Sequence, residues 1–160
     1  MKKNILAVCA ITATLAASTA MAAPGETESV STGQLNRAEI KMGEDTYSVV
    51  NFKLLMVVNK STHQSFKAGD VITINCVGIN NTLNKESTVD GNCVAKDSAG
   101  DSFATTFKRK GVLGQPGAGS QTVKGLTGKF AGMTGTCTYE AKYAQNDGVF
   151  IASFAKCSYK

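Results

Sequence analysis

The chain has 160 residues, 42% of them hydrophobic and 18% charged, with a formal net charge of +5 at pH 7. Its 17 basic residues are dispersed along the sequence, and only two of them are Arg. A nucleic-acid-binding surface requires a basic stripe, so this composition argues against a nucleic-acid partner. The length and the mild positive charge fit one domain with a single core.

The first 22 residues have the features of a bacterial Sec export signal. Lys2 and Lys3 precede an apolar core at residues 5–17, and residues 20–22 form an Ala-x-Ala cleavage motif. The apolar core is too short to anchor the chain in a bilayer. Cys9 lies inside this core, so we expect it to be lost with the signal. We therefore expect a periplasmic or secreted protein without a membrane anchor.

The remaining sequence, from residue 23 onward, alternates apolar and polar residues without a helical period. Residues 23–30 carry little apolar content and are expected to form a flexible N-terminus. The β-domain is expected over residues 31–160. The clearest alternating run is 47–58, and its apolar face consists of Val50, Phe52, Leu54, Met56 and Val58.

Turn signals rich in Gly, Asp and Asn separate this run from shorter ones at 71–77 and 103–107. The pattern predicts an all-β protein of about eight antiparallel strands, arranged as a barrel or a sandwich. A barrel is favoured because it leaves no exposed strand edge. The Gly-rich segment 111–120 is expected to be either a mobile connection or a lid over the barrel mouth.

Four cysteines remain outside the signal, and each pair flanks a turn. Cys76 and Cys93 are equidistant from an Asn-rich turn, and Cys137 and Cys157 are equidistant from Asp147. Antiparallel pairing about these turns places each cysteine opposite its partner, which predicts two hairpin disulfides. Export favours disulfides over a four-thiolate metal site, which would also need a C-x-x-C spacing. The crossed connectivities remain open.

The second hairpin supports this register. Pairing Cys137 with Cys157 collects Tyr139, Ala141 and Tyr143 on one dry face, as a half-buried strand pair requires. Phe154 is the exception, because it falls on the wetter face.

A glycine-rich run, Lys-Gly-Leu-Thr-Gly-Lys-Phe-Ala-Gly-Met-Thr-Gly-Thr, precedes this hairpin, with glycines at Gly125, Gly128, Gly132 and Gly135. It predicts a sharply bent turn and lacks the Gly-Lys-Ser/Thr of a P-loop. The run resembles the "G-T-G-K-[YF]-A-G-x-x-G" signature of the allene oxide cyclase barrel-like and dirigent-like proteins. Residues 90–101 resemble the "G-x-C-x-x-x-D-x-x-G-D" strand-turn of exported bacterial members.

This resemblance covers roughly residues 70–145 and implies an eight-stranded barrel with an apolar cavity. In that family, the plant cyclases and dirigent proteins shape a reactive intermediate. The family's functional polar residues lie outside the matched motifs, so the resemblance assigns no catalytic residue to this chain. The predicted cavity lining is Phe52, Leu54, Met56, Tyr139 and Tyr143.

Few other side chains suggest chemistry. Arg37 and Glu39 share one strand face, either as a polar pair inside the barrel or as a surface pair, and we favour the exterior. His63, the single histidine, lies in a polar loop and is expected to be solvated. Asp97 and Asp101 fit a hairpin turn better than a calcium loop.

We therefore expect an exported β-barrel that binds a small apolar ligand without catalysis, cofactor or metal. Two alternatives remain. One is a cyclase or isomerase of the allene oxide cyclase type, and the other is a structural envelope protein that binds a partner through its outer surface. The sequence does not indicate which oligomeric state the protein adopts.

Overall fold

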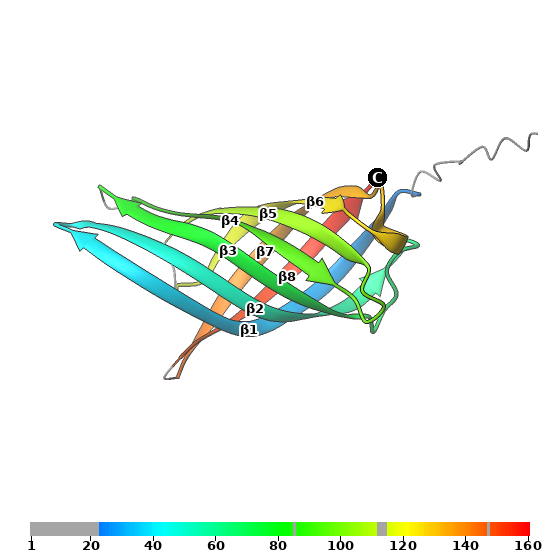
Figure 1. The fold of residues 1–160 in the computed structure, drawn as a ribbon, viewed down its shortest axis with the longest axis horizontal. Coiled ribbons are helices and arrows are strands. Elements are labelled where there is room, and N and C mark those ends of the chain that lie inside the picture. Colours follow the sequence, from blue (N-terminus) through cyan, green and yellow to red (C-terminus); the bar gives the residue numbers. More distant parts are fainter. Residues whose placement is uncertain (1–22, 85, 112–114, 147) are drawn as a thin grey trace, which may run out of the picture.

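The computed structural model describes residues 23–84, 86–111, 115–146 and 148–160, so the predicted export signal lies outside the described residues. Eight antiparallel strands close into one barrel in chain order, and β1 completes the ring by pairing with β8 (Figure 1). This confirms the predicted fold class. The elements are β1 (Gly25–Met42), β2 (Asp45–Ser61), β3 (Val71–Leu83), β4 (Glu86–Lys96), β5 (Ser102–Lys110), β6 (Gly117–Gly125), the 3-10 helix η1 (Gly128–Phe130), β7 (Thr134–Asn146) and β8 (Gly148–Tyr159).

Two segments expected to be irregular contain strand. β1 begins at Gly25, opposite Tyr159 of β8, so most of the expected flexible N-terminus at 23–30 is part of the barrel wall. The inward residues at the start of β1 are Thr27, Ser29 and Ser31, which carry hydroxyls. The alternation of apolar and polar residues therefore did not identify this part of the strand. Likewise, β6 begins at Gly117, so the expected loop at 111–120 ends earlier than predicted. Residues 112–114 of that loop lie outside the described part of the chain.

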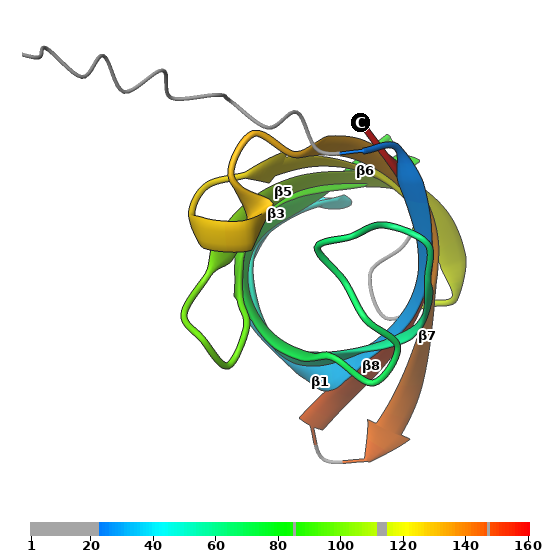
Figure 2. The same ribbon diagram turned by 90° about the vertical axis from the view of Figure 1, so that its right-hand side faces the viewer.

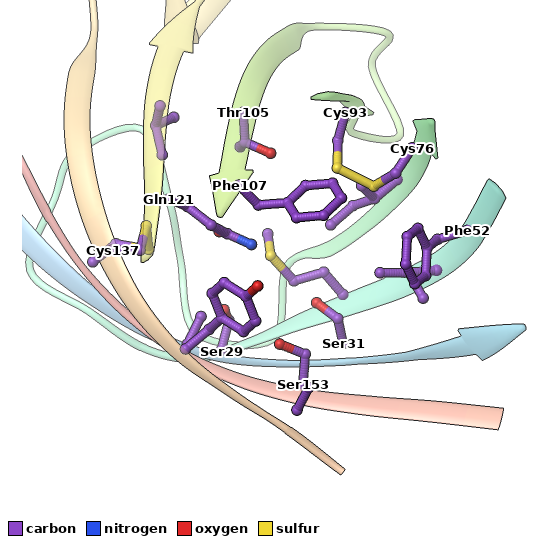
Figure 3. Close-up of a pocket in the computed structure, with 18 of the residues that line it drawn as sticks. Ser29, Ser31, Phe52, Cys76, Cys93, Thr105, Phe107, Gln121, Cys137 and Ser153 are labelled. Carbon is purple, nitrogen blue, oxygen red and sulfur yellow. A yellow bond between two sulfur atoms is a disulfide. The ribbon is translucent and has the colours of Figure 1, made fainter. Parts of the chain in front are cut away.

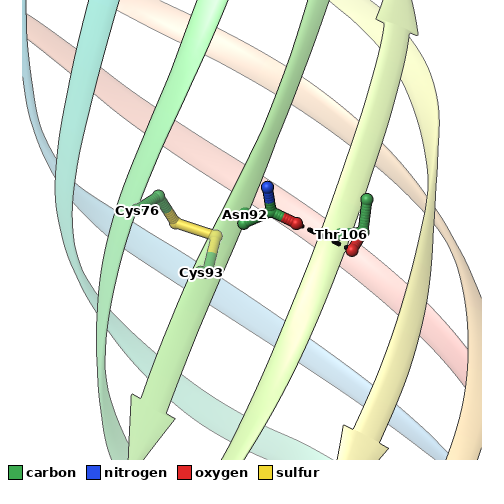
Figure 4. Close-up of a disulfide and its surroundings, with 4 residues drawn as sticks. All are labelled: Cys76, Asn92, Cys93 and Thr106. Carbon is green, nitrogen blue, oxygen red and sulfur yellow. Dashed lines mark hydrogen bonds between the residues drawn. A yellow bond between two sulfur atoms is a disulfide. The ribbon is translucent and has the colours of Figure 1, made fainter.

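Both predicted hairpin registers are confirmed. Cys76 lies opposite Cys93 in the β3–β4 ladder, and Cys137 lies opposite Cys157 in the β7–β8 ladder. Both pairs are disulfide-bonded, which excludes the crossed connectivities. Figure 4 shows the Cys76–Cys93 bridge between β3 and β4. The register places the dry face of the β7–β8 hairpin inside the barrel, while Phe154 is exposed on the outside.

One end of the barrel is closed by the loop between β2 and β3, which crosses the opening (Figure 2). Phe66 of this loop packs against the rings of Phe103, Phe130 and Tyr159, with ring centroids 5.0–5.8 Å apart within this cluster. Phe66 and Phe130 are almost completely buried. The aromatic cluster therefore forms a hydrophobic plug at this end. At the opposite end, β1 to β4 project beyond the other strands (Figure 1).

No helix in the described ranges is long and apolar enough to cross a membrane.

Candidate ligand cavity

A cavity of about 80 Å³ lies inside the barrel between the plug and the opposite mouth. One buried water needs roughly 10–15 Å³ of such space, whereas drug-sized sites have roughly 300–1,000 Å³. The space therefore fits a small or slender guest. All five residues predicted to line a cavity are in its wall: Phe52, Leu54, Met56, Tyr139 and Tyr143.

The wall is formed by inward-facing residues of every strand, and most of these residues are apolar. Phe52 and Phe107 form an edge-to-face pair with ring centroids 5.8 Å apart. Both disulfides also face the cavity, and Figure 3 shows the Cys76–Cys93 bridge beside the Phe107 ring. The bridges thus combine two roles, since they join neighbouring strands and form part of the wall.

Neutral polar groups interrupt this wall on two sides. Ser31 of β1 lies directly opposite Ser153 of β8, and Ser29 follows on the same face of β1. Thr105 and Gln121 belong to the wall on β5 and β6 (Figure 3). These hydroxyl and amide groups can donate to or accept from a ligand that carries oxygen or nitrogen.

The one charged residue among the described lining residues is Arg109 of β5, which is 5% exposed. Its Nη1 atom donates to the hydroxyl of Tyr143 at 3.2 Å, and its Nη2 atom donates to the carbonyl oxygen of Gln115 at 2.7 Å. The guanidinium carbon also lies 5.7 Å from the centroid of the Tyr143 ring. Arg109 therefore ties β5 to β7 and to the loop before β6.

Tyr139 lies in the same wall, and burial raises the pKa of its hydroxyl to about 12, although the nearby charge of Arg109 opposes the shift. The group therefore stays protonated at neutral pH and acts as a hydrogen-bond donor. At the plug, burial also raises the pKa of Tyr159, whose hydroxyl is 3.2 Å from Oγ1 of Thr27.

The Arg37–Glu39 pair is not on the outer wall that we expected. Arg37 lies opposite Val50 and Glu39 opposite Ser48, and both of these partners are buried. Directly opposed residues share a face, so the pair faces inward. The two side chains are only 3.5 Å apart but remain 43% and 26% exposed. The reason is that β1 projects beyond the closed barrel here, so the pair lies at the rim.

The prediction of a solvated His63 is wrong. The residue is 2% exposed, and its ring lies 5.0 Å from that of Tyr159. Its Nδ1 atom accepts the backbone N–H of Ser65 at 3.2 Å, and Nε2 has no hydrogen-bond partner within the described chain. Burial lowers the pKa of the imidazole. Phe66 anchors this loop in the hydrophobic plug, and His63 is buried with it. The polar composition of residues 59–65 gave no sign of this burial.

Asp97 and Asp101 bracket the β4–β5 turn, as expected for a hairpin. Oδ1 of Asp97 accepts the backbone N–H groups of Ala99 and Asp101, both at 2.9 Å. Oδ2 of Asp101 accepts the N–H of Lys129 at 3.1 Å. The part of the chain that the structure describes contains no group of three residues suited to bind a metal ion.

The glycine-rich run forms the bent turn that the sequence predicts. Gly128 and Gly132 have positive φ angles of 55° and 79°. Gly125 and Gly135 instead lie where the chain packs closely, against Phe130 and Tyr159 respectively.

The sequence interpretation missed Arg109 and the serines of the wall. The signal was the alternation itself, because Arg109 continues the inward series of Thr105 and Phe107. Ser31 likewise continues the series of Leu35. The sequence interpretation considered a charged pair inside the barrel only at Arg37 and Glu39, and it did not extend the inward series to Arg109 or Ser31.

Neither protein-family models nor curated protein sequences give a match to this chain. Among solved structures, the pterocarpan synthase dirigent protein superposes with a TM-score of 0.50 over 94% of this chain and 96% of that chain. The chain has a dirigent-like barrel fold. Because sequence identity is only 10%, this dirigent-like similarity concerns the fold alone.

Proposed function

We propose that this dirigent-like barrel binds a small, mainly apolar molecule in its interior without transforming it. The observation that carries the proposal is the cavity itself, which has apolar walls and is closed at one end by the plug around Phe66. A barrel with a filled interior would have served a purely structural role. The polar groups at Ser31, Ser153, Thr105 and Gln121 give a guest hydrogen-bonding partners.

Binding is favoured over catalysis by the chemistry of the wall. Among the lining residues that the structure describes, none is Asp, Glu or His, and all four cysteines are in disulfides. General acid–base and nucleophilic catalysis usually rely on these groups. Beyond the fold, the cyclase alternative is supported by the buried Arg109 in the cavity wall, but no described lining residue provides a carboxylate or an imidazole for proton transfer.

The site of action is proposed to be the periplasm or the extracellular space. The two disulfides indicate an oxidising compartment, and residues 1–22 have the pattern of an export signal.

Native mass spectrometry of the protein purified from its own compartment tests the proposal, and the expected result is a retained small molecule. An Ala155→Phe variant fills the cavity and should lose that molecule, because Ala155 lines the wall. Ala144→Phe is the matched control, because Ala144 lies on the exposed outer face of β7. This variant should retain the small molecule. Equal retention by both variants would place the molecule outside the cavity and contradict the proposal.

A further inference from the structure

The end of the cavity near Arg109 is rich in hydrogen-bond donors. The guanidinium group has five N–H donors and no acceptor. The hydroxyl of Tyr143 lies 3.2 Å from it, and the hydroxyl of Tyr139 is held protonated in the same wall. Donors concentrated at one end of an apolar space complement a ligand oxygen that carries negative charge.

Strand β6 provides the room for these side chains. A Cβ atom at Gly117 would lie 3.3 Å from Nε of Arg109, and one at Gly119 would collide with the ring of Tyr139. The two glycines therefore allow both side chains to pack directly against the backbone of β6. Larger residues there would displace them, so the position of the Arg109 head depends on the local sequence of β6.

The charge of Arg109 acts in surroundings that strengthen it. The other described residues of the wall are neutral, and most are apolar. Electrostatic interactions gain strength where water and other dipoles are excluded. A carboxylate is the ligand group that best matches a guanidinium, because two parallel N–H···O bonds can form. The neutral hydroxyls at Ser31 and Ser153 provide no comparable preference for charge.

We propose that the cavity selects small organic monocarboxylates, with Arg109 binding the carboxylate and the apolar body packing against Phe52 and Phe107. Tyr143 is a positioning residue, because its hydroxyl accepts a hydrogen bond from Arg109. This inference rests on the proposed binding function and specifies its ligand class.

The test compares two probes of nearly equal shape, 4-ethylbenzoate and its neutral isostere 4-ethylbenzamide, by isothermal titration calorimetry at neutral pH. The aliphatic pair hexanoate and hexanamide repeats the comparison with a slender body. Wild-type protein should bind each carboxylate about tenfold or more tightly than its amide, the ratio expected for a hydrogen bond to a charged partner.

Variants assign the preference to Arg109. Arg109→Gln should lose the preference for the carboxylate while keeping the affinity for the amide, and Arg109→Lys should retain part of it because the charge remains. Arg37→Gln is the matched control, because this arginine lies at the exposed rim and its loss should leave the preference unchanged. Amide binding and thermal unfolding show whether each variant is folded.

Each outcome is decisive. Equal affinity of wild type for both members of a pair overturns the carboxylate proposal but leaves the cavity as a binding site. A carboxylate preference that persists in Arg109→Gln also overturns the carboxylate proposal. If Arg109→Gln does not fold, an unchanged preference in both Arg109→Lys and Tyr143→Phe overturns it instead. Failure of all four probes to bind wild type overturns both this inference and the proposed binding function.

Discussion

The ammonium group of Lys129 lies 3.0 Å from the carboxylate of Asp97, which joins the glycine-rich turn to the turn between β4 and β5. The Asp97 side chain is only 7% exposed, and its other oxygen accepts two backbone N–H groups. Lys129 also lies 3.6 Å from Asp70 at the end of the plug loop. Three segments distant in the sequence are thus held together at the closed end of the barrel.

Asp97→Ala should lower the free energy of unfolding by about 1–3 kcal/mol, because it leaves backbone donors and the Lys129 cation without their acceptor. Asp97→Asn should cost less, since its side-chain oxygen can still accept the N–H groups. Urea denaturation measures both variants. The matched control is Glu140→Gln, whose 4.0 Å pair with Lys142 is well exposed and should contribute below about 0.5 kcal/mol. An equal loss in control and Asp97→Ala would contradict this account.

His63 should make the stability of the protein depend on pH. Burial lowers its pKa in the folded state below the ordinary value of 6.5, so the unfolded chain binds a proton more readily. Stability from this group is therefore complete above about pH 6.5 and decreases as the pH falls below that value. Thermal unfolding from pH 8 to pH 5 should show this decrease.

A His63→Phe variant should lose that dependence above pH 5, whatever its absolute stability. Glu28→Gln should keep it, because salt bridges with Lys60 and Lys156 lower the pKa of Glu28 below 4.5 and move its effect to more acidic conditions. A wild-type melting temperature that stays constant between pH 7.5 and pH 5 would refute the role assigned to the imidazole.

The disulfides should contribute substantially to stability. Their cysteines are separated by 17 and 20 residues, and loops of this size correspond to about 3 kcal/mol each in the chain-entropy model. The Cys76→Ala/Cys93→Ala double variant should therefore unfold at a clearly lower denaturant concentration. The wild type in reductant should be less stable than this variant without reductant, because the reduced wild type has no bridge and the variant retains one. No effect of reductant on either protein would show that the bridges are absent in solution.

Two glycines of the same turn should respond differently to alanine. At Gly125 a Cβ atom would collide with the carbonyl oxygen of Phe130, so Gly125→Ala requires the backbone to move and should cost more than about 2 kcal/mol. Gly132 has φ of 79° with open space around it, so Gly132→Ala should cost only about 1 kcal/mol from the left-handed conformation. Chemical denaturation compares the two, and a reversed order would contradict the packing described here.

Local patterns in the sequence predicted much of this molecule. Alternation along 47–58 identified the inward face of β2, and the symmetry of the cysteines about two turns identified both hairpin registers. These features follow from neighbouring residues and neighbouring strands, since period-two geometry fixes which side chains share a face. The lining by Phe52 and Tyr139 could be predicted for the same reason.

Closure of the barrel and the chemistry of its interior depended on contacts between distant segments. Only the pairing of β1 with β8 shows that Thr27 and Ser29 belong to a wall, and only the plug shows that His63 is buried. The rim position of Arg37 depends on how far β1 projects beyond its neighbours. The sequence by itself determined the alternating strand runs and the two hairpin registers that favour these disulfides, because these arise from local alternation and turn chemistry. It missed the start of β1 at Gly25 and of β6 at Gly117, where the inward residues are not apolar. The tertiary structure alone decided where Arg109 lies in the cavity, because that position results from eight strands meeting around one axis.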